Sequence, residues 1–319
     1  MSKTPWLSVL MPTYNGEAYL PFALHSIITQ RDSDIECIAI DDGSTDATIS
    51  ILKNYQDKLS INILQRERQG NWVANTNHAL SIAQGEYICF LHQDDVWLEN
   101  RLHVMKNLVG QFPEIVFFLH SSYYTDIAGQ RLGIWRCPLP AYPKIIKPRL
   151  MIENLLIQNF ISIPSPIFKR EVAMKVNGLD EKLWYTADWD FWLKVAACGN
   201  TMYYPKPLSG FRIHPNSQTV VRSSYLQDFR KQLDTVYEKH LLIWEAPEKA
   251  KRKIEGPARF SIEVNSALAG FVHQRNLKYL NLARSFLCLG FWGGYRYIKT
   301  SRIMERASAR IKAQLLRSQ

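Results

Sequence analysis

Apolar residues in the first third of the chain follow two alternating patterns, one typical of strands and the other typical of helices. Apolar runs of strand length occupy residues 6–11, 35–40, 61–64 and 87–91. Between these runs, over residues 19–29, 49–55 and 71–83, apolar side chains recur at the spacing of a helix face. Repeated strand–helix–strand units of this length predict a mostly parallel α/β sheet with helices on both faces.

After the fourth strand the pattern becomes less regular. We expect a helix that begins near Trp97 and carries Leu102 and Met105 on its apolar side. Three further segments are predicted as strands, at 115–120, at 161–168 and, as a short edge strand, at 202–205. The prolines at 138, 140 and 143 predict an extended surface loop over 131–147.

The last third of the chain is predicted to be helical. A helix over 191–197 precedes it, and from residue 225 onward apolar side chains recur at helical spacing. The last apolar segment predicts a helix over 276–289 that ends in an aromatic patch at 291–295. This patch lies beside basic residues, so it is compatible with an anionic membrane surface, with packing on the rest of the chain, or with a second subunit.

The composition indicates a globular intracellular protein. The 319 residues are 46% apolar, which is enough for one large domain or two modest ones. The five cysteines are scattered and show no CxxC pairing, as expected for free thiols in a reducing compartment. The first residues lack the apolar segment of a signal peptide, and no apolar run is long enough to span a membrane. We therefore expect a cytoplasmic protein.

The net charge of +10 is concentrated near the C-terminus. Residues 284–319 contain eight Lys and Arg residues and a single acidic residue, Glu305. Such a basic segment suits nucleic acid, anionic lipid or an acidic partner. Because the charge is local, it is not a nucleic-acid signature of the whole chain, and we expect no nucleic-acid partner.

Polar, turn-forming residues follow three of the four predicted strands: 13–15, 41–44 and 93–95. Each group is compatible with a plain turn or a helix cap, and Asp94 in particular with a cap. The carboxyl ends of parallel strands meet at one edge of a sheet, where ligands bind. Acidic residues gathered there indicate a divalent cation or a donor-rich ligand. Neither GxGxxG nor GxxxxGK[ST] occurs, which argues against a dinucleotide or P-loop site.

Four motifs in this order resemble the family 2 glycosyltransferases of the GT-A fold. They are Val-Leu-Met-Pro-Thr-Tyr-Asn at 9–15, Asp-Asp-Gly-Ser-Thr-Asp at 41–46, Arg-Gln-Gly at 68–70 with Asn77, and Gln-Asp-Asp-Val-Trp at 93–97. The resemblance covers roughly residues 7–219. It implies a Rossmann-like GT-A sheet and a hexosyl- or deoxyhexosyltransferase that uses a nucleotide sugar and a divalent cation, Mn²⁺ or Mg²⁺.

The resemblance also implies roles for particular residues. Those expected to bind the nucleotide sugar are Pro12, Thr13, Tyr14, Asn15, Asp41, Asp42, Arg68, Asn77, Gln93 and Asp94. Asp95 is expected to hold the metal, with His214 as a further ligand in a segment that resembles a family motif with Arg and His near the diphosphate. His92 stands where many members have an acidic residue. Arg68 is also compatible with a solvated charge, and His214 with a structural role.

The resemblance assigns the catalytic base to Asp188. The segment Ala-Asp-Trp-Asp at 187–190 precedes an aromatic-rich helix, although Ala187 replaces the usual Glu. Trp189 and Asp190 are candidate acceptor contacts. Helix capping is the alternative for both aspartates, and core packing is the alternative for Trp189. A single base without a nucleophile implies single displacement with inversion.

The sequence therefore predicts an inverting glycosyltransferase of bacterial surface-polysaccharide biosynthesis. We expect a catalytic domain over 1–222, with a nucleotide-sugar half to about 110 and an acceptor half over 111–222, and a helical basic region over 223–319. The expected partners are a UDP-, dTDP- or GDP-sugar, a glycan or lipid-linked acceptor, the membrane surface through the basic region, and a second subunit. The alternatives are a nucleotidylyltransferase and a non-catalytic nucleotide- or sugar-binding module.

Overall fold

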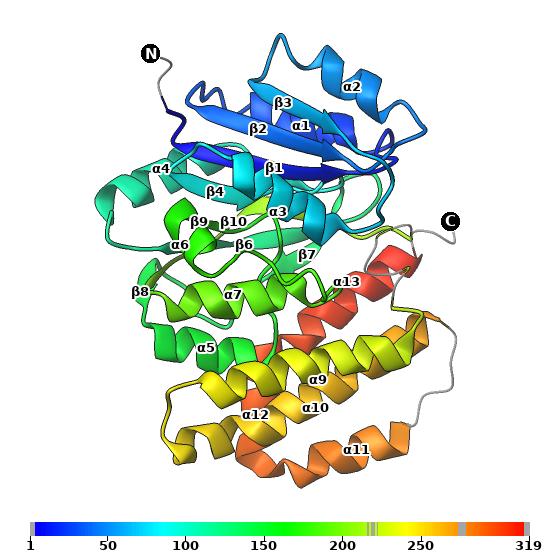
Figure 1. The fold of residues 1–319 in the computed structure, drawn as a ribbon. Helices are drawn as coiled ribbons and strands as arrows, with labels where there is room; N and C mark the ends of the chain where they lie inside the picture. The colour runs from blue at the N-terminus through cyan, green and yellow to red at the C-terminus, as the bar shows by residue number, and fades with distance from the viewer. Residues whose placement is uncertain (1–3, 216, 218–220, 222, 274–278, 316–319) are drawn as a thin grey trace.

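The structure is a computed structural model that describes residues 4–215, 217, 221, 223–273 and 279–315 (Figure 1). Its centre is one mixed sheet in the strand order β3-β2-β1-β4-β9-β6-β10-β5, with β7 paired to β6 and β8 to β10. The strands are β1 Leu7–Thr13, β2 Ile35–Asp41, β3 Ile61–Gln65, β4 Tyr87–Phe90, β5 Val96–Trp97, β6 Phe117–Thr125, β7 Arg131–Trp135, β8 Lys144–Ile146, β9 Ile167–Lys169 and β10 Thr201–Arg212.

The first half of the sheet has the predicted parallel arrangement. β1 lies between β2 and β4, and β3 pairs with β2, all in parallel. Leu7 pairs with Ile35 on one side and with Tyr87 on the other, so the three strands start level. In consequence Thr13 pairs with Asp41, and the polar residues that follow these strands emerge at the same edge.

Helices cover both faces of this sheet (Figure 1). They are α1 Leu20–Ile28, α2 Thr48–Asn54, α3 Trp72–Ile82, α4 Arg101–Gln111, α5 Pro148–Ile157, α6 Arg170–Lys175 and α7 Ala187–Ala197. Val9 and Leu10 are adjacent on β1 but belong to different apolar clusters, because neighbouring strand residues point to opposite faces. One cluster contains apolar residues of α1, α2 and α4, and the other contains those of α3, α5 and α7. The predicted α/β class is confirmed.

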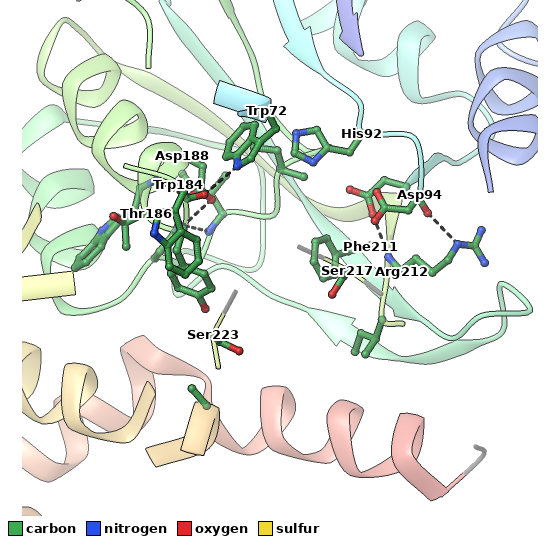
Figure 2. Close-up of a pocket in the computed structure, with 18 of the residues that line it drawn as sticks. Trp72, His92, Asp94, Trp184, Thr186, Asp188, Phe211, Arg212, Ser217 and Ser223 are labelled. Atoms are coloured by element: carbon green, nitrogen blue, oxygen red, sulfur yellow. Dashed lines mark hydrogen bonds between the residues drawn. The ribbon is translucent and has the colours of Figure 1, made fainter. Parts of the chain in front are cut away.

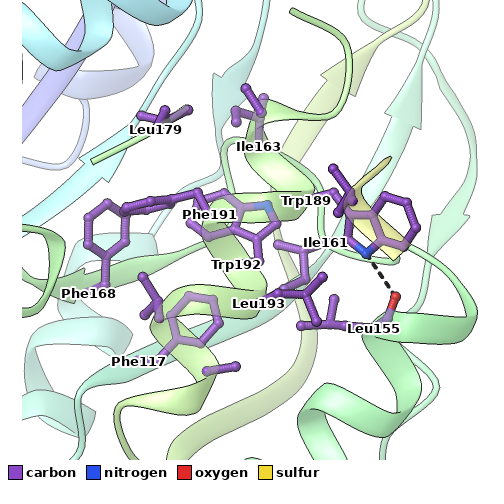
Figure 3. Packing of buried hydrophobic residues seen from close by; sticks show 14 of the residues in the cluster. Phe117, Leu155, Ile161, Ile163, Phe168, Leu179, Trp189, Phe191, Trp192 and Leu193 are labelled. Carbon is purple, nitrogen blue, oxygen red and sulfur yellow. Dashed lines mark hydrogen bonds between the residues drawn. The ribbon is translucent and has the colours of Figure 1, made fainter. Parts of the chain in front are cut away.

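The second half of the sheet mixes parallel and antiparallel pairs. β9 is antiparallel to both β4 and β6, whereas β6 and β10 are parallel. Aromatic side chains from this half form a dense core around Trp192, whose neighbours include Phe117, Phe168 and Phe191 (Figure 3). This core supports the beginning of α7, which carries Asp188.

The expected helix start near Trp97 is wrong. Val96 and Trp97 form β5, which pairs with β10, and α4 begins only at Arg101. Trp97 is buried against the sheet, so tertiary packing decides its conformation. Asp94 therefore does not cap a helix at this point.

The predicted loop over 131–147 is also wrong, and the strand predicted at 202–205 is present but is neither short nor at an edge of the sheet. The loop contains β7 and β8, because the prolines occupy only the connection between them. β10 extends to Arg212 and lies between β6 and β5. It accommodates Pro205 and Pro207 through register shifts after Tyr204 and Pro207, since proline cannot donate a ladder hydrogen bond.

The strand predicted over 161–168 is confined to β9, Ile167–Lys169. The residues before it are buried but form no strand, and a turn closes with the Ser165 N–H donating to the Ser162 carbonyl at 3.0 Å. Two prolines, at 164 and 166, interrupt any ladder in this segment.

The C-terminal part is helical as predicted. It consists of α9 Leu226–Ile243, α10 Glu248–Val272, α11 Tyr279–Cys288, α12 Gly290–Ser301 and α13 Ile303–Leu315. The predicted helix over 276–289 corresponds to α11, and its first residues lie outside the described ones. The aromatic patch at 291–295 is part of α12. None of the helices in the described part of the chain combines the length and apolar character needed to cross a membrane.

The C-terminal helices share the core of the sheet domain. Val236 and Tyr237 of α9 belong to the same apolar cluster as Trp192 of α7. On the other side, Ala309 and Ala313 of α13 are buried against Tyr124 and Leu132 of the β6–β7 hairpin. The division at residue 222 stays a prediction.

Candidate functional site

The carboxyl ends of β1, β2 and β4, the start of α7 and the C-terminal helices surround one cavity of about 350 Å³ (Figure 2). Of the residues predicted to bind the nucleotide sugar or the metal, eight line it: Pro12, Thr13, Tyr14, Asp42, Arg68, Gln93, Asp94 and Asp95. Asp188 and Trp189 line it from the α7 side. Residues that are far apart in the sequence thus line the same cavity, as the parallel topology predicts.

The loops after β1 and β2 hold each other in place. Asp41 is buried, and its carboxylate accepts hydrogen bonds from the Thr13 hydroxyl at 3.1 Å and the Ser44 N–H at 2.9 Å. The Asn15 side chain accepts from the Thr45 N–H at 2.9 Å. Asp41 and Asn15 therefore shape the turn, and Asp42 is the carboxylate of this pair that faces the cavity.

Asp42 is a fixed anion. It accepts hydrogen bonds from the N–H groups of Gln69 at 2.9 Å and Gly70 at 2.8 Å, and it pairs with Arg68. Although burial works against the charged form, these donors lower the pKa of Asp42 below its usual value. The Arg68 guanidinium lies 3.5 Å from the centre of the Tyr14 ring. Arg68 is therefore engaged with two other predicted site residues and is not simply solvated.

Gln93 joins the β4 end to the β1 loop. Its side chain accepts from the Tyr14 N–H at 2.8 Å and donates to the Tyr14 carbonyl at 2.9 Å. A Cβ atom at Gly16 would lie 2.5 Å from Gln93 Oε1, so this close approach requires glycine. Tyr14 is thereby held at a fixed position in the cavity wall.

Asn77 lies elsewhere. Its amide donates to the Leu179 carbonyl at 3.0 Å and to Glu181 at 2.9 Å, and it accepts from the Leu179 N–H at 2.9 Å. These contacts join α3 to the segment before α7. The α3 residues that line the cavity are Trp72 and Asn75, and the Asn75 side chain accepts from Arg66 at 3.1 Å.

Asp94 and Asp95 are placed differently. The Asp95 side chain is buried, and its Oδ1 accepts from the Arg212 N–H at 3.0 Å, while Oδ2 has no hydrogen-bond partner among the described residues. The Asp94 side chain is 23% exposed, and its Oδ2 lies 2.8 Å from His214 Nε2. Arg212 also donates to the Asp94 carbonyl oxygen at 2.9 Å (Figure 2).

The two carboxyl groups differ in acidity as well. Burial and the neighbouring Asp94 raise the pKa of Asp95 well above its usual value. Burial also disfavours a charge on Asp94, but the hydrogen bond from His214 and the electrostatic contributions of His214 and His92 together outweigh it and lower the pKa of Asp94. Thus Asp94 is the more accessible anion of the pair, and the expected division, with the metal on Asp95 and the nucleotide sugar on Asp94, stays a prediction.

The residues at this place fit a divalent cation in part. Carboxylate oxygens and an imidazole nitrogen are suitable ligands, and Asp95 Oδ2, a buried carboxylate oxygen to which no described residue donates, suits a cation. Within the described residues, however, no three His, Cys, Asp or Glu side chains are grouped as a metal site. His92, at the position that is often acidic, lies edge-on to Trp72 with ring centres 5.1 Å apart. Burial lowers the pKa of His92 and so favours its neutral form.

Asp188 lies in the first turn of α7 and faces the cavity. Its carboxylate accepts from the Asn159 amide at 3.0 Å and from the Trp189 N–H at 2.8 Å. Burial raises the pKa of Asp188 to about 6, although the hydrogen bond from Asn159 opposes this shift. A carboxylate of raised pKa is a stronger base than an ordinary one.

Asp190 and Trp189 contact protein groups. Asp190 is fully buried and pairs with Lys194 at 3.0 Å, Lys239 at 2.8 Å and His240 at 2.8 Å. It thereby joins α7 to α9, and it does not line the cavity. Trp189 is also buried, and its indole N–H donates to the Leu155 carbonyl at 2.8 Å. Its ring contributes to the cavity wall.

The site residues that were missed in the sequence include Asn159, Arg306 and Arg310. Asn159 has no local signal, since it lies in a loop 29 residues before its partner Asp188. The two arginines are spaced one helical turn apart, but in the sequence they count only as part of a basic segment.

Residues 8–175 match the family described as glycosyl transferase family 2. An uncharacterized glycosyltransferase of Rickettsia typhi is 26% identical over 71% of this chain and 70% of its own length. A second, from Methanocaldococcus jannaschii, is 32% identical over 60% of this chain and 65% of its own length. A putative teichuronic acid biosynthesis glycosyltransferase of Bacillus subtilis, TuaG, is 37% identical over 31% of this chain and 39% of its own length.

Solved structures with the same fold include two glycosyltransferase complexes. S. aureus TarS in complex with UDP-GlcNAc has a TM-score of 0.65 at 18% identity, over 95% of this chain and 91% of that one. The mannosyltransferase PcManGT of Pyrobaculum calidifontis, in complex with GDP-Man and Mn²⁺, has a TM-score of 0.56 at 17% identity, over 98% of this chain and 88% of that one. The family match spans more than half of the chain, so this protein belongs to glycosyl transferase family 2 and is a glycosyltransferase.

Proposed function

We propose that this enzyme transfers a sugar from a nucleotide sugar to an acceptor hydroxyl with inversion at the anomeric carbon. The observation that carries the proposal is the position of Asp188, a carboxylate of raised pKa in the same cavity as the strand-end residues Asp42 and Asp94. A base on one side of a cavity and a donor site on the other suit single displacement.

The donor is assigned to the strand-end side. Asp42 is an anion held by two N–H groups and suits the hydrogen-bond donors of a base or ribose. Tyr14, fixed by Gln93 and covered by Arg68, provides a flat surface for stacking. TarS and PcManGT bind UDP-GlcNAc and GDP-Man, which supports a nucleotide sugar as the donor here.

A divalent cation, Mn²⁺ or Mg²⁺, is proposed beside the acidic pair. Asp94 and His214 would hold it, with the buried Oδ2 of Asp95 as a further ligand. The bound cation supplies charge neutralisation for the diphosphate leaving group. The Mn²⁺ complex of PcManGT supports this assignment.

The chain itself supplies the base and its orientation. Asn159 holds one carboxylate oxygen of Asp188, and the Trp189 N–H holds the other, so the carboxylate has a fixed direction. In the ionised form it accepts the proton of the acceptor hydroxyl as that oxygen attacks the anomeric carbon. Trp189 and Tyr185 line the acceptor side and limit access of water.

The acceptor is proposed to be a glycan or lipid-linked sugar of a surface polysaccharide. The similarity to TuaG, a putative teichuronic acid biosynthesis enzyme, supports this context. On α11 and α12 the exposed Leu287, Phe291 and Trp292 lie beside Arg284 and Lys299, a combination that suits an anionic membrane surface.

Calorimetry tests the donor and cation sites. UDP, GDP and dTDP are titrated into the enzyme with Mn²⁺ and again with EDTA. We expect one nucleotide to bind in the presence of Mn²⁺ and to bind at least about tenfold more weakly in EDTA. Asp94→Asn should lose the Mn²⁺ dependence, whereas Asp126→Asn, outside the cavity lining, should keep it. If no nucleotide binds in either condition, the proposal is refuted.

A further inference from the structure

Two arginines of α13, Arg306 and Arg310, line the same cavity as Asp188. They are one helical turn apart, so they present their guanidinium groups on one face of the helix. Figure 2 shows α13, in pink, along the side of the cavity opposite Asp94 and His92. This arrangement places two cations across from the strand-end residues that we assign to the donor.

The position of α13 is fixed by its other face. Ala309 and Ala313 pack on Tyr124 and Leu132, and small side chains allow this close approach. Lys312 donates to the Leu132 carbonyl at 3.2 Å, and Glu305 pairs with Arg136 at 3.1 Å. The helix is therefore anchored on the β6–β7 hairpin, and the two arginines belong to the site wall.

Within the described residues, no carboxylate neutralises their charges. Arg306 donates to the Asn265 amide oxygen at 2.8 Å, and its second terminal nitrogen is buried with no hydrogen-bond partner in the part of the chain that the structure describes. In the described part of the chain, neither guanidinium forms an ion pair with a carboxylate, since Glu305 pairs with Arg136 and Arg302. Burial, together with the neighbouring Arg310, lowers the pKa of Arg306. Placing two adjacent cations in a partly buried cavity wall costs free energy unless an anion binds to them.

The two arginines line the cavity that Tyr185 and Asp188 also line. Burial raises the pKa of Tyr185, and the charges of Arg310 and Arg306 oppose this shift whereas the charge of Asp188 adds to it. The donor side already contains Arg68 on Tyr14, and Arg212 beside the acidic pair. The α13 pair is thus on the acceptor side of the cavity.

We propose that Arg306 and Arg310 bind an anionic group, a phosphate or a carboxylate, that the acceptor carries. The planar guanidinium groups offer paired N–H donors that match the oxygens of such a group. Held there, the anion orients the acceptor so that its hydroxyl reaches Asp188. This inference rests on the proposed function, because it presumes that the opposite side of the cavity holds the donor.

Calorimetry with a charged and a neutral sugar tests the proposal. The enzyme is first saturated with Mn²⁺ and with whichever of UDP, GDP and dTDP binds, and glucose 1-phosphate or methyl glucoside is then titrated. We compare wild type with the double variant Arg306→Gln/Arg310→Gln. A matched control, Arg284→Gln/Lys299→Gln, removes the same charge from exposed positions on α11 and α12.

We expect the double variant to bind glucose 1-phosphate at least about tenfold more weakly than wild type. The control should differ by less than about twofold, and affinity for methyl glucoside and for the nucleotide should be unchanged. If the double variant does not fold, Arg310→Gln alone, whose side chain makes no hydrogen bond within the described residues, should still weaken glucose 1-phosphate binding severalfold.

Equal affinity of wild type and variant for glucose 1-phosphate would overturn the proposal. So would a loss of nucleotide affinity in the variant, because the arginines would then belong to the donor site. These outcomes leave the proposed function intact. By contrast, if no nucleotide binds to the wild-type enzyme, the proposed function fails, and the acceptor assignment fails with it.

Discussion

Asp188 combines the features expected of a general base. It faces the cavity, it is oriented by Asn159 and the Trp189 N–H, and its pKa is raised to about 6 by burial. Asp190, only two residues away, is by contrast fully buried in an ion-pair network. Although burial works against its charge, the hydrogen bonds from His240 and Lys239 lower the pKa of Asp190. The pKa values of two carboxylates on one helix turn thus shift in opposite directions because their surroundings differ.

Replacing Asp188 with Asn tests this role. We expect Asp188→Asn to lower kcat by about 10²- to 10⁴-fold, since the acceptor hydroxyl loses its base. Nucleotide affinity should stay within about twofold, because the strand-end residues are unchanged. The measurement is steady-state transfer combined with calorimetry of nucleotide binding. If Asp188→Asn had the same kcat as wild type, Asp188 would not be the base.

The pH dependence of kcat/KM tests the same group in another way. The base is active only when ionised, so kcat/KM should be constant above pH 6 and fall about tenfold per pH unit below it. Because the hydrogen bond from Asn159 stabilises the charged form of Asp188, Asn159→Ala should move the acidic limb of the pH profile to higher pH by about half a unit to one unit. A limb near pH 4 in wild type, or no shift in the variant, would contradict this account.

At the scale of elements, Asp190 links α7, the helix that carries Asp188, to α9. Asp190 pairs with Lys194 on its own helix and with Lys239 and His240 on α9. The side chains of Asp190 and His240 are both buried, so removing the carboxylate would leave polar groups without their partner.

We therefore expect Asp190→Asn to lower the free energy of unfolding by about 3 kcal/mol. For comparison, Asp234→Asn removes a partly exposed pair with Arg230 and should change it by less than about 1 kcal/mol. Thermal unfolding followed by circular dichroism would show the difference. Equal losses of unfolding free energy in the two variants would mean that the buried ion-pair network of Asp190 does not stabilise the α7–α9 pair.

The elements also show what the sequence can predict. The site residues after β1, β2 and β4 were found because parallel strands bring their carboxyl ends to one edge, which depends only on local periodicity and strand order. β10 was mistaken for a short edge strand, because its register shifts around Pro207 depend on the neighbouring β6. Likewise, Asn159, Arg306 and Arg310 reach the site through helix and loop packing that has no local signature.

At the scale of the whole molecule, the C-terminal helices have two different faces. One packs on the sheet domain and brings Arg306 and Arg310 to the cavity. Another exposes apolar side chains, among them Leu287, Phe291 and Trp292, which are 77%, 78% and 78% exposed. Large apolar side chains grouped on a surface mark a site of interaction.

If this exposed face contacts a membrane, the enzyme should bind vesicles of phosphatidylglycerol and phosphatidylcholine, and added salt should weaken the binding. Phe291→Ser/Trp292→Ser should reduce vesicle binding at least about tenfold, since both side chains lose their contact with lipid. Met174→Ser, at a half-exposed position on α6, is the control and should bind like wild type. Co-sedimentation is the measurement, and equal binding by all three proteins would exclude this face.

The central claim is that one cavity holds a nucleotide sugar, a divalent cation and the base Asp188. Its most direct test is the release of nucleoside diphosphate from UDP-, GDP- and dTDP-sugars, measured with Mn²⁺ and a polysaccharide-type acceptor. We predict that wild type releases the diphosphate from one donor class, that EDTA abolishes the release, and that Asp188→Asn slows it at least about 10²-fold while still binding the nucleotide. Release that is equally fast in Asp188→Asn and in EDTA would contradict the account.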